Sequence, residues 1–523
     1  MNHCDRNWPG ATANACPVWA KKCVDFIPNH QWGHCVQEAI PGGPGGHGNV
    51  ANATNMPAMV PWTSEDGKTN GFVAINGTAF PAQWLTSSTT SIEATWPIVV
   101  ANWIEPRCTV ASISADRTKL TLASPCGRNV AAREGAKPLQ LPIYFEAAPG
   151  YPLAQGVFYH DRDNRVIYYN PLQGQTKDAA STISVQEVLV RYANVTGHTW
   201  EHVAFSHTTW FQANTDDGFV DTQSIVYKCQ PTSANCSKGG QGEPLGAVQV
   251  ASSTELTFQF CSFVHLGSAY GLSAWKSSTR ITAHSNTFDD LSGGFLKLGS
   301  IDPSNGAGSA DPSQWDSHFS ATHNTASNQA VEYSGAAGFF GGYLFSADIS
   351  HNTVSDAGYS GFSVGWGWGG TDCPGFGNNT VSYNKIYNVM SKLQDGGGIY
   401  VNGATNPDHG WNTMSNNWVN NDEHEFAVYY LDNGASHWHV THNVASNSTT
   451  AWAYFMTGGT GDPTNAAHNN TFDYFWYEND EGPRNNCPQY GCRVDNATVF
   501  HISPPATMPP AAVAIMNAAG AKP

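Results

Sequence analysis

The chain has 523 residues, a formal net charge of −17 and only 12% charged residues. Glycine is abundant, at 52 residues, while lysine and glutamate are scarce, so the composition argues against a helical bundle and favours strands and turns. The 18 Trp, 20 Tyr and 24 Phe provide the apolar surface of a packed core, which excludes a disordered chain, and the lack of basic clusters argues against nucleic-acid binding.

The first segment, residues 1–60, is rich in cysteine and glycine and is not assigned to a fold. Its opening, MNHCDRNWPG, lacks the basic and apolar regions of a signal peptide. No apolar run in the chain reaches the roughly 18 residues that a membrane span needs. The chain is therefore expected either to be intracellular or to lack its natural start, and the cysteine content favours the second alternative.

Three later pairs of cysteines have the spacing of short disulfide loops: Cys108 with Cys126, Cys229 with Cys236, and Cys487 with Cys492. Metal ligation is the alternative, but the sequence has no C-x-x-C pair and no zinc-finger spacing. We therefore predict disulfides and an extracellular or secretory location, and we expect neither a metal site nor a cofactor.

Residues 61–178 are expected to form a small β-rich domain. Runs such as FVAINGTAF and KLTLASP have the composition of short strands, and turn residues separate them. The stretch GVFYHDRDNRVIYYN predicts a hairpin with Asp163 and Asn164 at its tip.

Residues 179–503 carry a loose repeat in which an asparagine follows a β-prone tripeptide, as in ITAHSNTF and DISHNTV. The repeated positions are Asn286, Asn324, Asn352, Asn384, Asn417, Asn443 and Asn470, with Cys261 in an earlier copy. Short strand-like runs lie between the copies, and helical periodicity is absent. We predict an all-β fold, a right-handed parallel β-helix, whose asparagines stack at one corner of successive coils. The Pro/Ala-rich tail, residues 504–523, is expected to be peripheral.

Histidines precede several of the repeated asparagines, at His323, His351, His442 and His468. Stacked coils would align some of them, and a metal site is one interpretation of such an arrangement. Because no Asp or Cys recurs beside them, we interpret these histidines as a repeated surface column.

Three acidic motifs flanked by glycine lie in the second half of the predicted solenoid: SDAGYSG with Asp356, LQDGGGIY with Asp395, and YYLDNGAS with Asp432. Asp356 and Asp395 are about one coil plus an insertion apart, so adjacent coils could bring their carboxylates within the roughly 5–10 Å that glycoside hydrolysis uses. We predict that Asp356 and Asp395 are catalytic, one as proton donor and the other as nucleophile or base. Ordinary turn chemistry is the alternative reading of each aspartate.

Aromatic side chains are interleaved with these motifs, and such rings stack on the C–H faces of sugars. Among them Trp366 and Trp368, which are embedded in glycines, are expected to be exposed. The predicted substrate-binding residues are Asp432, Tyr359, Trp366, Trp368, Tyr400, Tyr430 and His437.

The order of these features resembles glycoside hydrolase family 141. The shared motifs are the W-x-x-x-R segment from Trp103 to Arg107, the hairpin, the VAFSHTTW strand and the three acidic turns, over about residues 70–500. The resemblance implies a parallel β-helix that hydrolyses plant polysaccharide linkages, with α-L-fucosidase and xylanase activities. It also implies that Asp356 and Asp395 are the catalytic acid and its partner, and that Asp432 is a substrate-binding or supporting carboxylate. Residues 1–60 match neither the signal peptide nor the first coil that are usual in that family.

We therefore predict a secreted, monomeric glycoside hydrolase that acts on a poly- or oligosaccharide of plant or algal cell walls and binds neither nucleic acid nor membranes. One alternative is a uronate polysaccharide lyase or epimerase on the same scaffold, for which Lys385 and Lys392 are the candidate basic groups. Another is a non-catalytic carbohydrate-binding solenoid.

Overall fold

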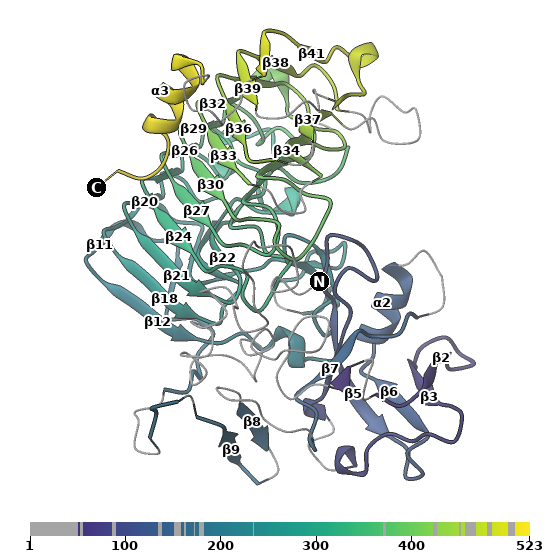
Figure 1. Ribbon diagram of the computed structural model, residues 1–523. Coiled ribbons are helices and arrows are strands. Elements are labelled where there is room, and N and C mark those ends of the chain that lie inside the picture. The colour runs from purple at the N-terminus through teal and green to yellow at the C-terminus, as the bar shows by residue number, and fades with distance from the viewer. Residues whose placement is uncertain are drawn as a thin grey trace.

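The computed structural model is dominated by three long parallel sheets, beside a smaller antiparallel sheet (Figure 1). The residues that the structure describes are 51–52, 56–85, 90–133, 139–150, 158–161, 164–171, 173–176, 182–233, 235–369, 373–421, 426–448, 451–455, 467–477, 484–499 and 508–522. The four N-terminal cysteines lie outside these residues.

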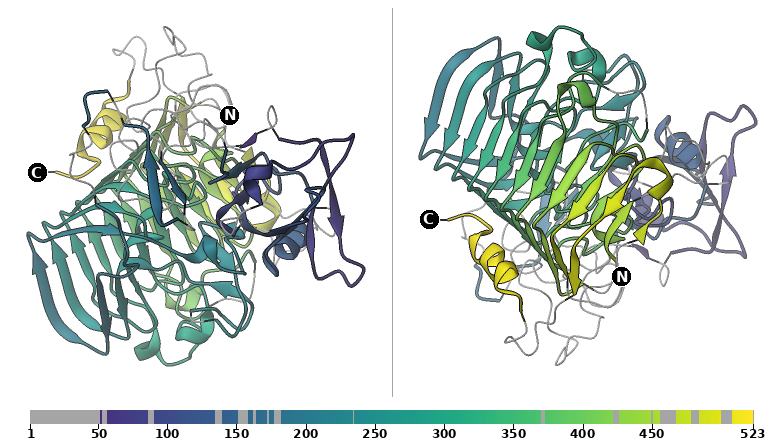
Figure 2. Two further views of the ribbon diagram at one scale, coloured as in Figure 1. Left: turned by 90° about the horizontal axis from the view of Figure 1, so that it is seen from below. Right: turned by 90° about the horizontal axis from the view of Figure 1, so that it is seen from above.

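The small sheet has seven antiparallel strands and packs on one helix, α2 (Cys126–Arg133). Its strands, in spatial order, are β1 (Ala51–Asn52), β7 (Tyr144–Glu146), β4 (Glu93–Thr95), β5 (Arg107–Ile113), β6 (Lys119–Leu122), β3 (Asn70–Ala74) and β2 (Met59–Thr63). Phe72, Trp84, Trp96 and Phe145 form its aromatic core. The views in Figure 2 show this purple and blue domain at the side of the larger body.

The predicted hairpin is confirmed as two antiparallel strands, β8 (Phe158–Asp161) and β9 (Val166–Tyr169). Asn164 follows β8 and its side chain donates to Asp161 at 2.8 Å, as is typical of a tight turn. Asp163, the other predicted tip residue, lies outside the described residues.

The three parallel sheets have ten strands each, and every strand but the last in each sheet pairs with its counterpart one coil later. The first sheet comprises β10 (Val190–Ala193), β16 (Gly246–Ala251), β19 (Tyr270–Trp275), β22 (Gly294–Leu298), β25 (Phe339–Gly341), β28 (Phe362–Val364), β31 (Ile399–Val401), β34 (Ala427–Leu431), β37 (Ala451–Phe455) and β40 (Arg484–Asn485). The second comprises β11 (Thr196–Glu201), β17 (Thr254–Gln259), β20 (Thr282–His284), β23 (Ser320–Thr322), β26 (Asp348–Ser350), β29 (Thr380–Ser382), β32 (Asn412–Ser415), β35 (Trp438–Thr441), β38 (Thr471–Asp473) and β41 (Arg493–Val494). The third comprises β12 (Ala204–Thr208), β18 (Ser262–Leu266), β21 (Thr287–Leu291), β24 (Thr325–Ser327), β27 (Thr353–Ser355), β30 (Lys385–Tyr387), β33 (Trp418–Asn420), β36 (Val444–Ser446), β39 (Phe475–Tyr477) and β42 (Ala497–Val499).

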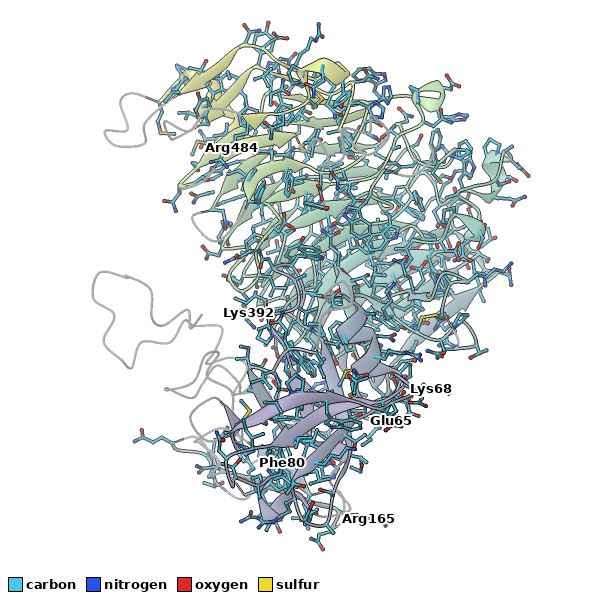
Figure 3. The ribbon with its side chains drawn as sticks, turned by 90° about the vertical axis from the view of Figure 1, so that its right-hand side faces the viewer. Glu65, Lys68, Phe80, Arg165, Lys392 and Arg484 are labelled. Carbon is cyan, nitrogen blue, oxygen red and sulfur yellow. A yellow bond between two sulfur atoms is a disulfide. The ribbon has the colours of Figure 1, made fainter. Side chains whose placement is uncertain are left out.

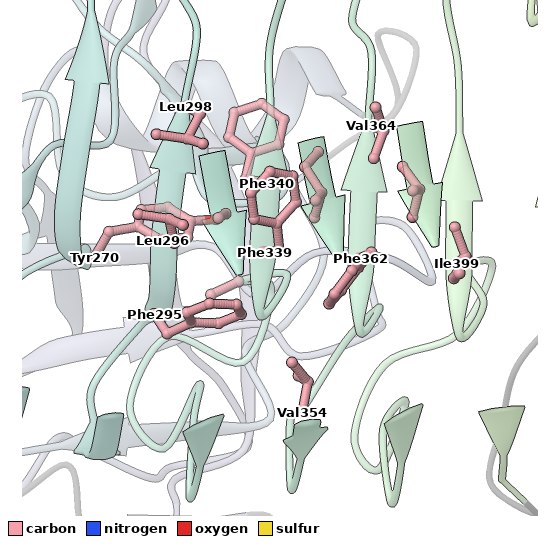
Figure 4. Packing of buried hydrophobic residues seen from close by; sticks show 14 of the residues in the cluster. Tyr270, Phe295, Leu296, Leu298, Phe339, Phe340, Val354, Phe362, Val364 and Ile399 are labelled. Carbon is pink, nitrogen blue, oxygen red and sulfur yellow. The ribbon is translucent and has the colours of Figure 1, made fainter. Parts of the chain in front are cut away.

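Because the chain visits the three sheets in turn and then returns to the first, the long parallel sheets have the arrangement of a β-helix. Its right-handed sense stays a prediction. The interior is filled by columns of apolar side chains from equivalent positions. Figure 4 shows one such column in the first sheet, formed by Leu296, Phe339, Phe362 and Ile399.

The predicted asparagine ladder is confirmed at the corner between the second and third sheets. Each Asn accepts hydrogen bonds through Oδ1 from the backbone and side chain of the Asn one coil earlier, as Asn384 does from Asn352 at 2.9 and 3.0 Å. The ladder runs through Asn286, Asn324, Asn352, Asn384, Asn417 and Asn443, and Cys261 precedes it.

The placement of Asn470 on this ladder is wrong. Asn470 lies at the corner between the first and second sheets, where its Oδ1 accepts from the Trp438 amide at 3.0 Å. A second, shorter ladder at that corner links Asn379 to Asn412, with Asn379 N donating to Asn412 Oδ1 at 2.9 Å.

The histidines partly follow the expected surface column. His323 and His351 stack with ring centroids 4.8 Å apart, and His351 stacks on Tyr383 at the same distance. His442 stacks instead on Tyr474. His468 lies at the other corner, beside His437, so it is not part of the column.

All three predicted disulfides are present. Cys108–Cys126 joins β5 to α2, Cys487–Cys492 lies in the last coil, and Cys229–Cys236 closes an insertion between β12 and β16. The insertion, residues 209–245, contains a three-stranded sheet of β13 (Asp221–Gln223), β14 (Val226–Lys228) and β15 (Gln241–Gly242).

The tail forms a helix, α3 (Pro510–Ala518), which packs Ala512 and Ile515 against Val444 of the third sheet (Figure 1). Short 3-10 turns occupy Ala82–Trp84, Gln212–Asn214, Pro303–Asn305, Pro312–Gln314, Pro407–His409 and Pro488–Tyr490. Among the helices of the described residues, none is both long and apolar enough to span a membrane.

Candidate functional site

The candidate site lies on the outer face of the first sheet, at β31 and β34. Side chains alternate along a strand, so Ile399 and Val401 enter the core while Tyr400 points outward. Tyr430 of β34 is the register partner of Tyr400, and their rings meet edge to face with centroids 5.2 Å apart. This pair of buried tyrosines lies between two aspartates, Asp395 and Asp432, and donates to both of them.

Asp395 lies just before β31, in a left-handed backbone conformation with φ 58°. Its Oδ1 accepts a hydrogen bond from the Tyr430 hydroxyl at 3.2 Å. Burial raises the pKa of the Asp395 carboxyl, and the Tyr430 hydrogen bond opposes that rise. The next residue must be glycine, because a Cβ at Gly396 would lie 2.8 Å from the Tyr359 ring.

Asp432 directly follows β34. Because β31 and β34 are parallel neighbours, Asp395 lies before the N-terminal end of this strand pair and Asp432 lies at its C-terminal end. The Tyr400 hydroxyl donates to its Oδ2 at 2.5 Å. The pKa of Asp432 is raised to about 6: burial is the largest cause, the hydrogen bond from Tyr400 opposes it, and the negative charge of Asp395 adds to the rise.

The two carboxylates are neighbours of one hydroxyl group. Tyr430 donates its hydroxyl proton to Asp395, and the same hydroxyl contributes to lowering the pKa of Asp432. Two nearby carboxyls with raised pKa values can hold a proton on one partner and a negative charge on the other.

Asp356 does not occupy the position expected for it. The sequence predicts that Asp356 and Asp395 are equivalent residues of adjacent coils, but the register places Asn388, not Asp395, opposite Asp356. Asp356 directly follows β27 of the third sheet, where Ser355 and Asn388 donate to its carboxylate at 2.8 and 3.2 Å. Among the described residues, no hydrogen bond or ion pair links Asp356 to Asp395 or Asp432.

The predicted aromatic residues are more buried than expected. Tyr359 is fully buried, with its hydroxyl committed to hydrogen bonds inside the protein. The expectation that Trp366 is exposed is wrong: it is 4% exposed, because it packs on Phe340 of β25.

Trp368 is half-buried, in a T-shaped contact with Trp366 at 4.6 Å. Its loop touches the turn after Asp432, since a Cβ at Gly434 would lie 2.4 Å from the backbone of Gly369. His437 lies apart from this group, at the corner before β35, between Trp411 and His468. The structure thus brings Asp395, Asp432, Tyr400, Tyr430 and Trp368 to one side of the solenoid.

Sequence reasoning missed two contributors. The amide of Asn402 donates to the Tyr400 hydroxyl at 3.3 Å, and Gln223 of the insertion donates to the Tyr359 hydroxyl at 2.8 Å. The only sequence feature that could have identified Asn402 is its position one coil before Asp432. No sequence feature identifies Gln223.

The two lysines considered for lyase chemistry are engaged elsewhere. Lys385 lies over the ring of Trp418, on the third sheet. Lys392 donates to the Val331 carbonyl at 3.2 Å, on the side of the solenoid next to the small domain (Figure 3). Within the described part of the chain, no lysine or arginine forms an ion pair with Asp395 or Asp432.

The fold is similar to that of a solved structure titled "Glycoside hydrolase", with a TM-score of 0.64 and 19% sequence identity, over 91% of this chain and 77% of that one. At this identity the likeness concerns the fold alone. A structure of PfbA, a surface adhesin of Streptococcus pneumoniae, aligns with a TM-score of 0.19 and 9% identity over 59% of this chain and 72% of the adhesin, which is too low to support an argument. No protein-family model matches the sequence, and neither does any curated protein.

Proposed function

We propose that the protein is a glycoside hydrolase in which Asp395 and Asp432 form the catalytic pair. The observation that carries this proposal is that two touching tyrosines donate to two half-buried carboxyls, Tyr430 to Asp395 and Tyr400 to Asp432, with the pKa of Asp432 raised to about 6. A carboxyl that retains its proton near neutral pH is what a general acid requires. The solved structure with the similar fold is also named a glycoside hydrolase.

Asp432 is the proposed general acid, because burial and the charge of Asp395 both favour its protonated form. It would protonate the glycosidic oxygen as the bond to the leaving group breaks. Asp395 would act on the opposite side of the sugar, as nucleophile or as base for water. Tyr430 donates to Asp395 and so holds that carboxylate against the tyrosine pair.

The substrate we propose is a neutral plant or algal cell-wall glycan, with α-L-fucosidic or xylosidic linkages as first candidates from the family resemblance. Trp368, half-buried beside the Asp432 turn, is the aromatic residue best placed to stack on a sugar ring. The three disulfides support an extracellular location.

The test is a screen of aryl fucosides, xylosides and arabinosides together with xylan, using the unaltered protein and the variants Asp395→Asn, Asp432→Asn and Asp356→Asn. We expect release of reducing sugar that falls at least about a hundredfold in the first two variants. Asp356→Asn is expected to retain activity, with all melting temperatures similar.

Each contrary outcome identifies a different account. If Asp356→Asn and Asp395→Asn abolish hydrolysis while Asp432→Asn does not, the pair predicted from the sequence is correct and the proposed pair is wrong. An ultraviolet-absorbing unsaturated product would indicate a lyase. Glycan binding without turnover would indicate a binding solenoid.

A further inference from the structure

We infer that Gln223 is a positioning residue for Asp395 and acts through the hydroxyl of Tyr359. The inference rests on the proposed function of Asp395. The Gln223 amide donates to Tyr359 Oη at 2.8 Å, and that hydroxyl donates to the backbone carbonyl of Asp395 at 2.9 Å. Both Gln223 and Tyr359 are buried, so water does not replace these bonds readily.

The backbone at Asp395 is held by hydrogen bonds to two other parts of the chain. Its φ of 58° lies in the left-handed region, which aspartate adopts more readily than most non-glycine residues and which recurs at other turns of this fold. The bond from Tyr359 fixes the carbonyl of Asp395 itself. On the other side, the amide of Gln394 donates to the carbonyl of Asn102 in the small domain at 2.8 Å. Together these bonds fix the direction in which the carboxyl of Asp395 leaves the chain, toward Tyr430.

The insertion that carries Gln223 is itself held in place. The Trp103 indole donates to the carbonyl of Thr222 at 2.9 Å, and the Thr222 hydroxyl donates to the carbonyl of Val226 at 2.8 Å. The Cys229–Cys236 disulfide closes the loop that follows β14. The small domain is therefore connected to Asp395 by the hydrogen bond from Trp103 to Thr222, by the peptide bond from Thr222 to Gln223, and by the two hydrogen bonds of the Tyr359 hydroxyl.

The direction of donation makes the role of Gln223 specific. When the neutral amide donates to Tyr359 Oη, the phenol proton is free to go to the Asp395 carbonyl. Without the amide, the hydroxyl can still donate to the Asp395 carbonyl, but the donor that directs its proton there is gone. The expected consequence is a loosened Asp395, with little change in the solenoid.

The experiment compares Gln223→Leu and Tyr359→Phe with a matched control, Tyr429→Phe. Tyr429 is equally buried and its hydroxyl also donates to backbone carbonyls, those of Asn417 at 3.2 Å and Val444 at 3.0 Å, but it points into the core. We expect both test variants to lower kcat about ten- to hundredfold with KM nearly unchanged. The control is expected to lose a similar amount of thermal stability and to keep its kcat.

A second readout does not need turnover. Carbon-detected NMR titration should show a lower pKa for the Asp395 carboxyl in Gln223→Leu, because a released side chain becomes more hydrated. An unchanged pKa of Asp395 in Gln223→Leu overturns the positioning role, as does an unchanged kcat in an otherwise active enzyme. Failure of the proposed function itself would show as full activity of Asp395→Asn. That result does not depend on the Gln223 variants, so the two failures are distinguishable.

Discussion

The hydroxyl of Tyr430 donates a hydrogen bond to Oδ1 of Asp395 at 3.2 Å, from the coil that follows the one in which Asp395 lies. The bond joins a residue before β31 to a residue within β34. It exists only when these two coils are stacked in the observed register, with Tyr400 opposite Tyr430. The candidate site is therefore a property of the assembled solenoid and not of one motif.

The activity should depend on pH through Asp432. As the general acid, Asp432 must be protonated, so kcat should fall as the pH rises through about 6. The hydrogen bond from Tyr400 favours the ionised form, so Tyr400→Phe should raise the pKa of Asp432 and move the alkaline limb of the pH–rate profile, where kcat falls, to higher pH by roughly one pH unit or less. A pH–rate profile measures the limb, with Tyr429→Phe as the control. A limb that stays fixed or moves to lower pH contradicts the assignment.

The asparagine ladder should be a main source of solenoid stability. Asn384 is fully buried, accepts from Asn352, and donates to the Ile349 carbonyl and to Asn417. Asn384→Ala leaves several of these buried groups without a partner and should reduce the free energy of unfolding by about 3 kcal/mol or more. Thr380→Ala, on the outer face of β29, should have an effect within about 0.5 kcal/mol. Denaturant unfolding of the two variants makes the comparison, and equal losses would count against the ladder.

A buried arginine should hold the small domain on the solenoid. Arg107 of β5 pairs with Glu105 at 2.5 Å and Glu146 at 3.1 Å, and it donates to the carbonyl of Glu332 at 2.6 Å. Arg107→Met removes the cation and leaves two buried carboxylates, which should cost about 3–5 kcal/mol. Differential scanning calorimetry should show an earlier transition than in the exposed-site control, Arg128→Met. If both variants melt alike, the ion pairs do not anchor the domain.

The coil architecture could be predicted because its chemistry repeats in the sequence. An asparagine that bonds to the equivalent asparagine of the next coil must recur once per coil, so residues such as Asn352 and Asn384 can be identified from the sequence repeat alone. The error at Asn470 arose because the spacing of the repeats does not say which corner an asparagine occupies. The disulfides were predictable because each closes a short loop.

The candidate site could be predicted only in part. Asp395 and Asp432 stand in recognisable turns, but loops of different length between the strands decide which turns meet. For this reason Asp356, rather than Asp432, was the expected partner of Asp395. Gln223 could not be found at all, because it contacts Tyr359 across 136 residues through an insertion without a repeat.

Asp395 and Asp432 are proposed to form one electrostatically coupled pair. The most direct test of this coupling is an NMR titration of the Asp432 carboxyl in the unaltered protein and in Asp395→Asn. The account predicts a pKa of about 6 in the unaltered protein. It also predicts a lower pKa for Asp432 in the variant, because the neighbouring negative charge is gone. An Asp432 that titrates at the same pH in both proteins would contradict the account.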